Sequence, residues 1–470
     1  MISTRRTWLQ GTACGFGSLA LSAMAGTNVY ADTISPLPRY HITPRVKRII
    51  FLFMQGGVSH VDSFDYKPLL EKRNGEQIAF QDARVLAKTG KRDSAFKVMK
   101  SPWKFRSYGE SGKRVSDLFP KTAQHVDSLC LIHSMHTEGV AHGPATLFMH
   151  CGSTNFVRPS MGSWLLYGLG SENENLPGFI SISPSIGNGG PRNYGSAFLP
   201  AKYQGTPLGQ AGTKDTDLSI KHLLGESRSR EQRREQLELL QAINRQQAAI
   251  HGHDEQMEAV IESYEMAWRM QATAPDVLDL SRESASTLEL YGIGKQPTDD
   301  YGRKCLLARR LCEAGVRFVQ VNYGDNSANP AWDQHSNIPK HADHAAAVDQ
   351  PIAGLLTDLK QRGLLEDTLV WWGGEFGRTP YAQDNGTGRD HNPGGFTVWL
   401  AGAGVQAGLS YGETDEFGSE AVHQKVHMHD LHASILHLMG LDHERLTYRY
   451  AGRDFRLTDV HGRVIHGLFS

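Results

Sequence analysis

Cysteine is scarce in this sequence, and its scarcity excludes several kinds of protein. The chain has 5 cysteines in 470 residues and no pair at CxxC spacing. Neither a disulfide scaffold nor a thiolate zinc site is therefore expected. An excess of one charge is also missing, because 49 Lys and Arg face 50 Asp and Glu, for a net charge of -1. This balance excludes a strongly basic nucleic-acid binder, and we expect no nucleic acid among the partners.

Long hydrophobic runs are absent beyond the amino-terminal segment. No later stretch reaches eighteen consecutive apolar residues, so the mature chain is expected to have no stable membrane span. Hydrophobic residues still make up 39% of the chain, which is enough for a large core. The length allows one large domain or two to three ordinary ones. The 22 histidines justify a search for a metal or acid–base site.

The first residues are typical of an export signal. Arg5 and Arg6 precede an apolar, Gly/Ser-rich stretch over 11–25 that is too short to span a bilayer. The arginine pair resembles a twin-arginine signal, and a chance pair before an ordinary secretory signal is the alternative. Cleavage is expected after Ala25 or after Ala31. We therefore predict a signal peptide over 1–31, recognition by the twin-arginine export machinery, and a periplasmic or extracellular protein.

Short apolar runs alternate with helical patterns along the rest of the chain. Several helical patterns end at a glycine, as 301–314 does before Gly315, and lead directly into the next apolar run. This alternation predicts an α/β fold with a largely parallel central sheet and helices on both faces. The predicted strands are 48–54, 129–135, 179–183, 316–323, 368–372 and 396–401, and the predicted helices include 301–314, 351–362 and 426–439.

Three other segments have a distinct character. Residues 226–290 carry dense mixed charge and almost no strand formers, which predicts a helical pair inserted into the α/β core. The Gly/Pro-rich stretch 184–207 is predicted to be a loop, and a short strand pair is expected after the last helix. Cys305 and Cys312 are seven residues apart in a helical pattern, so we expect both on one buried face.

Polar residues gather where the predicted strands end. In open α/β sheets, ligands bind beyond the carboxyl ends of the strands. Carboxylates and imidazoles from successive strand ends would converge there on one divalent cation: oxygen ligands suit Ca, Mg or Mn, and the imidazoles also allow Zn. The candidate ligands are His60, Asp62, Asp333, His335, Glu375 and His391, with His142 and Arg378 as candidate catalytic residues.

Each of these residues also has an ordinary structural interpretation. Asp62 and Asp65 would cap the turn that follows the first strand. Glu375 would form an ion pair with Arg378. The pairs Asp333/His335 and Asp390/His391 would lie in solvated loops. For the histidines on helical patterns we favour packing or surface roles, and these are His341, His344, His427, His429, His432 and His437.

Five motifs together resemble one family. In order they are GGVSHVDSFDYKP, GRKCLLARRLCEAGVRFVQV, WDQHSN, GLLEDTLVWWGGEFGRTP and GRDHNPGGFTVWLAGAGV. They resemble the domain-of-unknown-function family numbered 1501, which is sulfatase-like and belongs to the alkaline phosphatase superfamily. The resemblance covers roughly residue 40 to the end. It implies one sulfatase-like domain over 40–470 with an alkaline phosphatase-like three-layer sandwich, and commonly twin-arginine export.

The resemblance also implies site residues, with departures. Where sulfatases have two metal-binding aspartates after the first strand, this chain has Gln55 and Gly56, so His60 or Asp62 would have to substitute. The nucleophile motif matches 142–146, which keeps the proline but lacks the Cys or Ser and the Arg. A formylglycine sulfatase is therefore not expected, and His142 would serve as nucleophile, general acid–base or ligand.

The later metal positions of the superfamily are only partly kept. Glu375 matches an acidic ligand, although the histidine that should follow it is replaced by a phenylalanine. His391 matches a later metal histidine, and Asp333 and His335 resemble the ligands between them. One metal, or a remodelled site, is expected in place of a binuclear centre.

Three functions remain open at this stage. The first is a secreted or periplasmic metal-dependent hydrolase of phosphate or sulfate esters, acting on a small molecule or a polysaccharide, in which Arg378 or Arg389 would bind the oxyanion. The second is a non-catalytic binding or scaffold protein on a degenerate sulfatase-like fold. The third is a phosphoryl transferase using His142. Fold-level resemblance carries most of the assignment of reaction class.

Overall fold

The computed structural model describes residues 40–80, 95–212, 230–251, 255–383 and 386–470. The predicted signal peptide over 1–31 lies outside the described residues. Within them, no helix is both long and apolar enough to cross a membrane.

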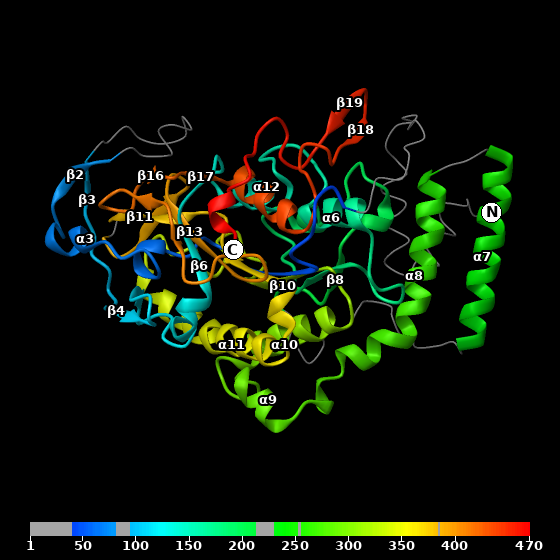
Figure 1. The fold of residues 1–470 in the computed structure, drawn as a ribbon, viewed down its shortest axis with the longest axis horizontal. Helices are drawn as coiled ribbons and strands as arrows, with labels where there is room; N and C mark the ends of the chain where they lie inside the picture. Colours follow the sequence, from blue (N-terminus) through cyan, green and yellow to red (C-terminus); the bar gives the residue numbers. More distant parts are fainter. Residues whose placement is uncertain (1–39, 81–94, 213–229, 252–254, 384–385) are drawn as a thin grey trace, which may run out of the picture.

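A single large sheet forms the centre of the molecule (Figure 1). The strands from β10 through β1, β9 and β7 to β8 are parallel, whereas β13 is antiparallel to both of its neighbours, β10 and β6. The sheet is therefore largely parallel, as predicted. Its strands in spatial order are β14 (Ser410–Tyr411), β6 (Leu129–His136), β13 (Phe396–Gly402), β10 (Thr368–Gly373), β1 (Arg48–Met54), β9 (Phe318–Tyr323), β7 (Phe179–Ile182) and β8 (Thr206–Leu208), with β17 (Val426–His427) also paired to β6.

Both faces of this sheet are buried, because successive side chains of a strand point to opposite sides. In β1, Ile50, Leu52 and Met54 enter one core cluster, and the residues between them enter the other. Helices α10 (Asp299–Glu313) and α11 (His341–Gln361) pack on the first cluster. Helices α5 (His142–Cys151), α6 (Met161–Leu169) and α12 (Met428–Leu438) pack on the second. The result is the predicted three-layer α/β arrangement, visible in Figure 1.

Most predicted elements are present, with shifted bounds. Helix α11 begins at His341, ten residues before the predicted start, and continues through Pro351. The periodicity of 341–350 is weak, but Ala345 and Val348 are buried in the core, and this tertiary packing extends the helix. Strand β8 lies at the end of the segment predicted as a loop and pairs with β7 at the sheet edge, where Pro207 is tolerated.

The segment predicted as a helical insertion contains α7 (Arg230–His251), α8 (Glu255–Leu278) and α9 (Ala285–Leu290). In Figure 1 α7 and α8 stand side by side at one end of the molecule. Met270 and Ala274 of α8 are buried in the core cluster shared with α10. Cys305 and Cys312 are buried in the same cluster, as predicted.

Short elements complete the structure, among them the predicted strand pair near the carboxyl terminus, β18 (Tyr448–Tyr450) with β19 (Arg453–Phe455). A second pair, β11 (Gly377–Ala382) with β12 (Arg389–Asn392), follows β10 and was not predicted. The remaining α-helix and strands are α3 (Pro68–Lys72), β2 (Gln77–Ala79), β3 (Ala95–Lys97), β4 (Phe105–Tyr108), β5 (Lys113–Ser116), β15 (Glu413–Thr414) and β16 (Ala421–His423), and short 3-10 helices lie between several elements.

Candidate metal centre

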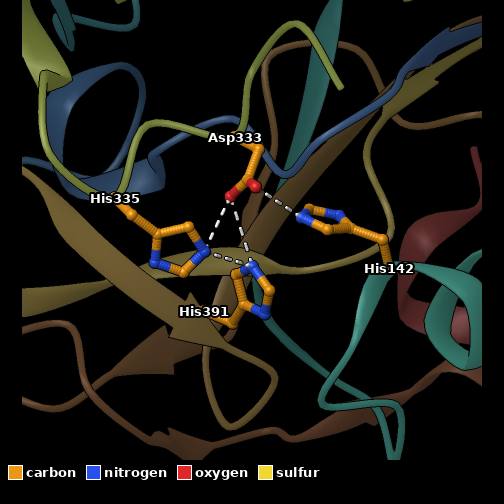
Figure 2. Close-up of side chains that lie close together, drawn as sticks. All are labelled: His142, Asp333, His335 and His391. Carbon is orange, nitrogen blue, oxygen red and sulfur yellow. Dashed lines mark hydrogen bonds and ion pairs between the residues drawn. The ribbon is translucent and has the colours of Figure 1, made fainter. Parts of the chain in front are cut away.

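Four side chains from distant parts of the chain meet beyond the carboxyl ends of the parallel strands. His142 is the first residue of α5, Asp333 and His335 lie between β9 and α11, and His391 belongs to β12. Each offers one ligand atom, and these four atoms all lie within 4.8 Å of one another (Figure 2). We refer to these four residues as the candidate metal centre.

The carboxylate of Asp333 is the hub of this group. Its Oδ1 lies 2.9 Å from Nε2 of His335 and 3.3 Å from Nε2 of His391. Its Oδ2 lies 3.2 Å from Nε2 of His142. All three imidazoles therefore turn the same nitrogen, Nε2, toward one carboxylate, as Figure 2 shows.

The other nitrogen of each imidazole is held by an oxygen that accepts a hydrogen bond. Nδ1 of His142 donates to Oε1 of Glu375 at 2.7 Å, and Nδ1 of His391 donates to the carbonyl of Val140 at 2.8 Å. Nδ1 of His335 donates to the side-chain oxygen of Gln383. Because these oxygens only accept, each ring carries a proton on Nδ1, and in a neutral ring Nε2 is left with a lone pair. This is the arrangement that orients metal-ligating histidines.

The positions of the Nε2 atoms fit a bound cation. Nε2 of His335 and Nε2 of His391 are 2.9 Å apart, and neither carries a proton in the tautomer just described. Nε2 of His142 is buried and makes no hydrogen bond of acceptable geometry, although Asp333 is close. Ligand atoms about 2.0–2.2 Å from a tetrahedral zinc ion are separated by roughly 3.3 Å. Three imidazoles and one carboxylate at these separations satisfy the chemistry of a divalent metal site.

The electrostatics of the candidate metal centre favour forms of Asp333 and His391 that could bind a metal. In the metal-free protein burial acts to raise the pKa of Asp333. Hydrogen bonds that the imidazoles of His142, His335 and His391 donate when Nε2 is protonated, together with the charge of Arg378, outweigh burial and hold this pKa well below its usual range. Burial, aided by Arg378, lowers the pKa of His391 to about 3. Asp333 is thus anionic and His391 neutral at pH 7.

His142 behaves differently from His391. Burial acts to lower the pKa of His142, but the carboxylates of Asp333 and Glu375 reverse this effect and raise the pKa above its ordinary value. A proton therefore competes with a metal for His142 more strongly than for His391.

The arginines predicted to bind an oxyanion are both engaged within the protein. The guanidinium of Arg378 is fully buried, donates to Oδ1 of Asp333 at 2.7 Å, and contacts the carbonyls of Gly56, Gly57, Trp332 and Arg389. The alternative in which Glu375 pairs with Arg378 is not found, since the carboxylate partner of Arg378 is Asp333. Arg378 thus joins three segments of backbone around the candidate metal centre.

His60 and Asp62 are not brought into the candidate metal centre. Both oxygens of Asp62 accept from the buried guanidinium of Arg389, at 2.7 and 3.0 Å. Nε2 of His60 lies 2.7 Å from the carbonyl of Gly418. Asp62 therefore neutralises Arg389 inside the protein, and neither Asp62 nor His60 replaces a ligand missing after the first strand.

Some residues that shape the site were not predicted. Gln383 and the carbonyl of Val140 orient two imidazoles, and Phe376 packs against the rings of His142 and His391, with centroids 5.1 and 4.4 Å away. Nothing in their local sequence indicates these roles, because each depends on a contact between distant segments. Only Phe376 could have been noticed in the sequence, because it occupies the position where the family resemblance leads one to expect a ligand histidine.

Comparison with protein families gives one match. The model of a family described as "Protein of unknown function (DUF1501)" matches residues 46–469. No curated protein matches the chain.

Among solved structures, the chain is similar to Ps i-CgsB, with 11% identity over 84% of this chain and 72% of that chain and a TM-score of 0.36. It is also similar to the lipoteichoic acid synthase LtaP from Listeria monocytogenes, with 8% identity, coverage of 94% and 80%, and a TM-score of 0.33. A third similar structure is the alkaline phosphatase from the Antarctic bacterium TAB5, with 13% identity, coverage of 80% and 96%, and a TM-score of 0.30.

Proposed function

Since this chain belongs to the DUF1501 family, which carries no assigned activity, we propose from its own residues that it is a metal-dependent hydrolase of phosphate or sulfate esters. The observation that supports this proposal is the convergence of three oriented Nε2 atoms and one carboxylate within 4.8 Å. The ester class follows from the sulfatase-like motifs of the sequence. The twin-arginine resemblance of the first residues adds a periplasmic or extracellular location to the proposal.

The residues of the candidate metal centre would hold one divalent cation, which we expect to be Zn or Mn because imidazoles predominate. Such a cation polarises an ester oxygen and lowers the pKa of a bound water. The protein orients the three imidazoles through the hydrogen bonds that their Nδ1 atoms donate. The ring of Phe376 forms an apolar wall beside His391. The half-buried His335, whose side chain is 32% exposed, marks the side from which a substrate would approach.

The geometry of the site argues against a phosphoryl transferase and leaves a non-catalytic binding protein as an alternative. A phosphoryl-transfer role for His142 needs a free ring nitrogen, and in our proposal Nε2 ligates the metal while Nδ1 is held by Glu375. The non-catalytic alternative is favoured by one observation: Arg378 and Arg389 are both buried and paired with carboxylates, so neither is available to an oxyanion. It remains the second candidate function.

Metal content and ester hydrolysis test the proposal together. The wild-type protein should contain about one transition metal per chain and hydrolyse 4-nitrophenyl phosphate or sulfate. The variants His335→Ala and His391→Ala should lose both metal and activity, because each removes a ligand. The matched control is His423→Ala, which changes an exposed histidine of β16.

Elemental analysis and chelation decide between the two candidate functions. Activity that disappears with a chelator and returns with Zn or Mn would support the hydrolase. A protein that binds metal but hydrolyses neither ester would favour the binding protein. A folded wild-type protein that holds no metal, and gains none from Ca, Mg, Mn or Zn, contradicts the metal-dependent hydrolase.

A further inference from the structure

We propose that Glu375 is the positioning residue of the candidate metal centre: it holds His142 in the orientation needed for ligation and is not itself a ligand. This inference rests on the metal site put forward above. The sequence had suggested Glu375 as a metal ligand, whereas here Glu375 orients a ligand.

Both oxygens of the Glu375 carboxylate accept hydrogen bonds from within the protein. Its Oε1 accepts from the backbone N–H of Gly56 at 2.9 Å and from Nδ1 of His142 at 2.7 Å. Its Oε2 accepts from the same Gly56 N–H at 3.1 Å. The side chain is fully buried. Glu375 therefore links the end of β1 to the first residue of α5.

Glu375 also stands on the wrong side of His142 for ligation. It receives Nδ1, whereas Nε2 on the far side of the ring points toward Asp333. Seen from Asp333, the carboxylate of Glu375 lies behind the imidazole. A metal ligand must lie about 2.0–2.2 Å from the ion, and a group behind the ring of another ligand does not meet this condition.

The segment that carries Glu375 is packed tightly against β1. A Cβ placed on Gly374 would approach the carbonyl oxygen of Met54 to 2.7 Å, and one on Gly57 would approach the ring of Phe376 to 2.6 Å. These close approaches leave little room for the backbone around Glu375 to shift. A positioning group held this firmly fixes its partner to the precision that a metal site needs.

Among the three imidazoles, His142 has the closest carboxylate at Nδ1, since Oε1 of Glu375 lies 2.7 Å away. His391 donates from Nδ1 to a backbone carbonyl and His335 to the neutral side chain of Gln383, and the carboxylate of Asp390 lies 3.5 Å from Nδ1 of His335. A carboxylate partner makes an imidazole a stronger metal ligand than a neutral partner does. The strength of the His142 bond to the metal should therefore depend on Glu375.

Binding of Co²⁺ to the metal-free protein separates a positioning role from a ligand role. The variants are Glu375→Gln, which keeps an oxygen for Nδ1 but removes the charge, and Glu375→Ala, which removes the acceptor. His335→Ala serves as the ligand-loss reference. Glu71→Gln, an exposed glutamate on α3, is the matched control. Affinity is measured by titration, and the ligand set by Co²⁺ absorption and X-ray absorption.

For a positioning residue, Glu375→Gln should weaken Co²⁺ binding by roughly 10-fold and Glu375→Ala by roughly 100-fold, the range for orienting partners of ligands. In Glu375→Gln the absorption spectrum and the number of bound imidazoles should match the wild type, whereas His335→Ala should lose one imidazole. The Gln variant is isosteric, so it keeps the test valid if Glu375→Ala fails to fold.

Two results would overturn the proposal. One is loss of an oxygen ligand in Glu375→Gln, which would make Glu375 a ligand. The other is wild-type Co²⁺ affinity in both folded variants, which would leave it no role in positioning. Neither result bears on the hydrolase, which fails separately if the metal-loaded wild type hydrolyses no ester.

Discussion

At the scale of single residues, the partner of a charged group decides its role. Asp62 and Asp333 are both buried carboxylates that face a buried arginine. Both oxygens of Asp62 accept hydrogen bonds from Arg389. Asp333 gives only Oδ1 to Arg378, and its carboxylate also faces three imidazoles, with Oδ1 near Nε2 of His335 and of His391 and Oδ2 near Nε2 of His142. Residue type alone does not distinguish these two situations.

Replacement of Asp62 tests this distinction. In Asp62→Asn the guanidinium of Arg389 is left buried without a compensating charge, so the free energy of unfolding should fall by about 3–5 kcal/mol. Urea denaturation measures this loss, and the folded variant should keep the metal content of the wild type. The control is Asp454→Asn, because the pair of Asp454 with Arg449 is exposed and should change stability by less than about 1 kcal/mol. Loss of metal without loss of stability would instead make Asp62 a ligand.

At the scale of elements, close backbone approaches position the residues of the candidate metal centre. The loop after β9 carries His335 against the turn before β12, where Gly388 leaves no space for a side chain. A Cβ on Gly388 would lie 2.1 Å from the carbonyl oxygen of His335. By contrast, a Cβ on Gly143, the second residue of α5, meets nothing within 4 Å. Gly388 therefore cannot carry a side chain without moving its neighbours, whereas Gly143 has room for one.

Alanine at each of these glycines should have opposite effects. Gly388→Ala should displace the backbone at His335 and weaken Zn²⁺ or Co²⁺ binding at least about 10-fold, as loss of a supporting contact does. Gly143→Ala should leave metal affinity unchanged and raise the free energy of unfolding by up to about 1 kcal/mol, because alanine is favoured in helices. Metal titration and urea denaturation check both. Equal affinities in the two variants would show that the approach of Gly388 to His335 does not position the ligand.

At the scale of the whole molecule, burial of histidine should make stability depend on pH. Burial lowers the pKa of His150 and of His432 to about 4, and that of His429 to about 2, against 6.5 in a solvated chain. Below pH 6.5 the unfolded chain takes up protons at these positions and the folded protein does not. The folded state is therefore favoured above pH 6.5, and this advantage is lost as the pH falls toward 4.

Each of these groups should contribute a slope of up to about 1.4 kcal/mol per pH unit between pH 6.5 and 4. Urea denaturation at pH 7, 6 and 5 should show a steadily falling free energy of unfolding. His432→Gln, which removes one titrating group from α12, should reduce the slope. Stability that stays constant between pH 7 and 5 would contradict the expected protonation difference.

The sequence by itself determined the α/β class and the positions of the buried strands. Strand β1 was predicted with its observed bounds, because a continuous apolar run that stops at two glycines admits few other interpretations. Helix α11 was predicted too short, since its first ten residues become helical through contacts that a local pattern does not contain. The choice of His142, Asp333, His335 and His391 as candidate functional residues also came from the sequence, through their places after strands and the family resemblance.

Tertiary structure decided how those residues are divided among roles. It paired Asp62 with Arg389, turned Glu375 toward Nδ1 of His142, and used both arginines inside the protein. These contacts join residues 45, 233 and 327 positions apart, and their geometry depends on strand order and side-chain direction. Hydrogen bonds and ion pairs act over about 3 Å, a precision that the spacing of residues along a chain does not contain.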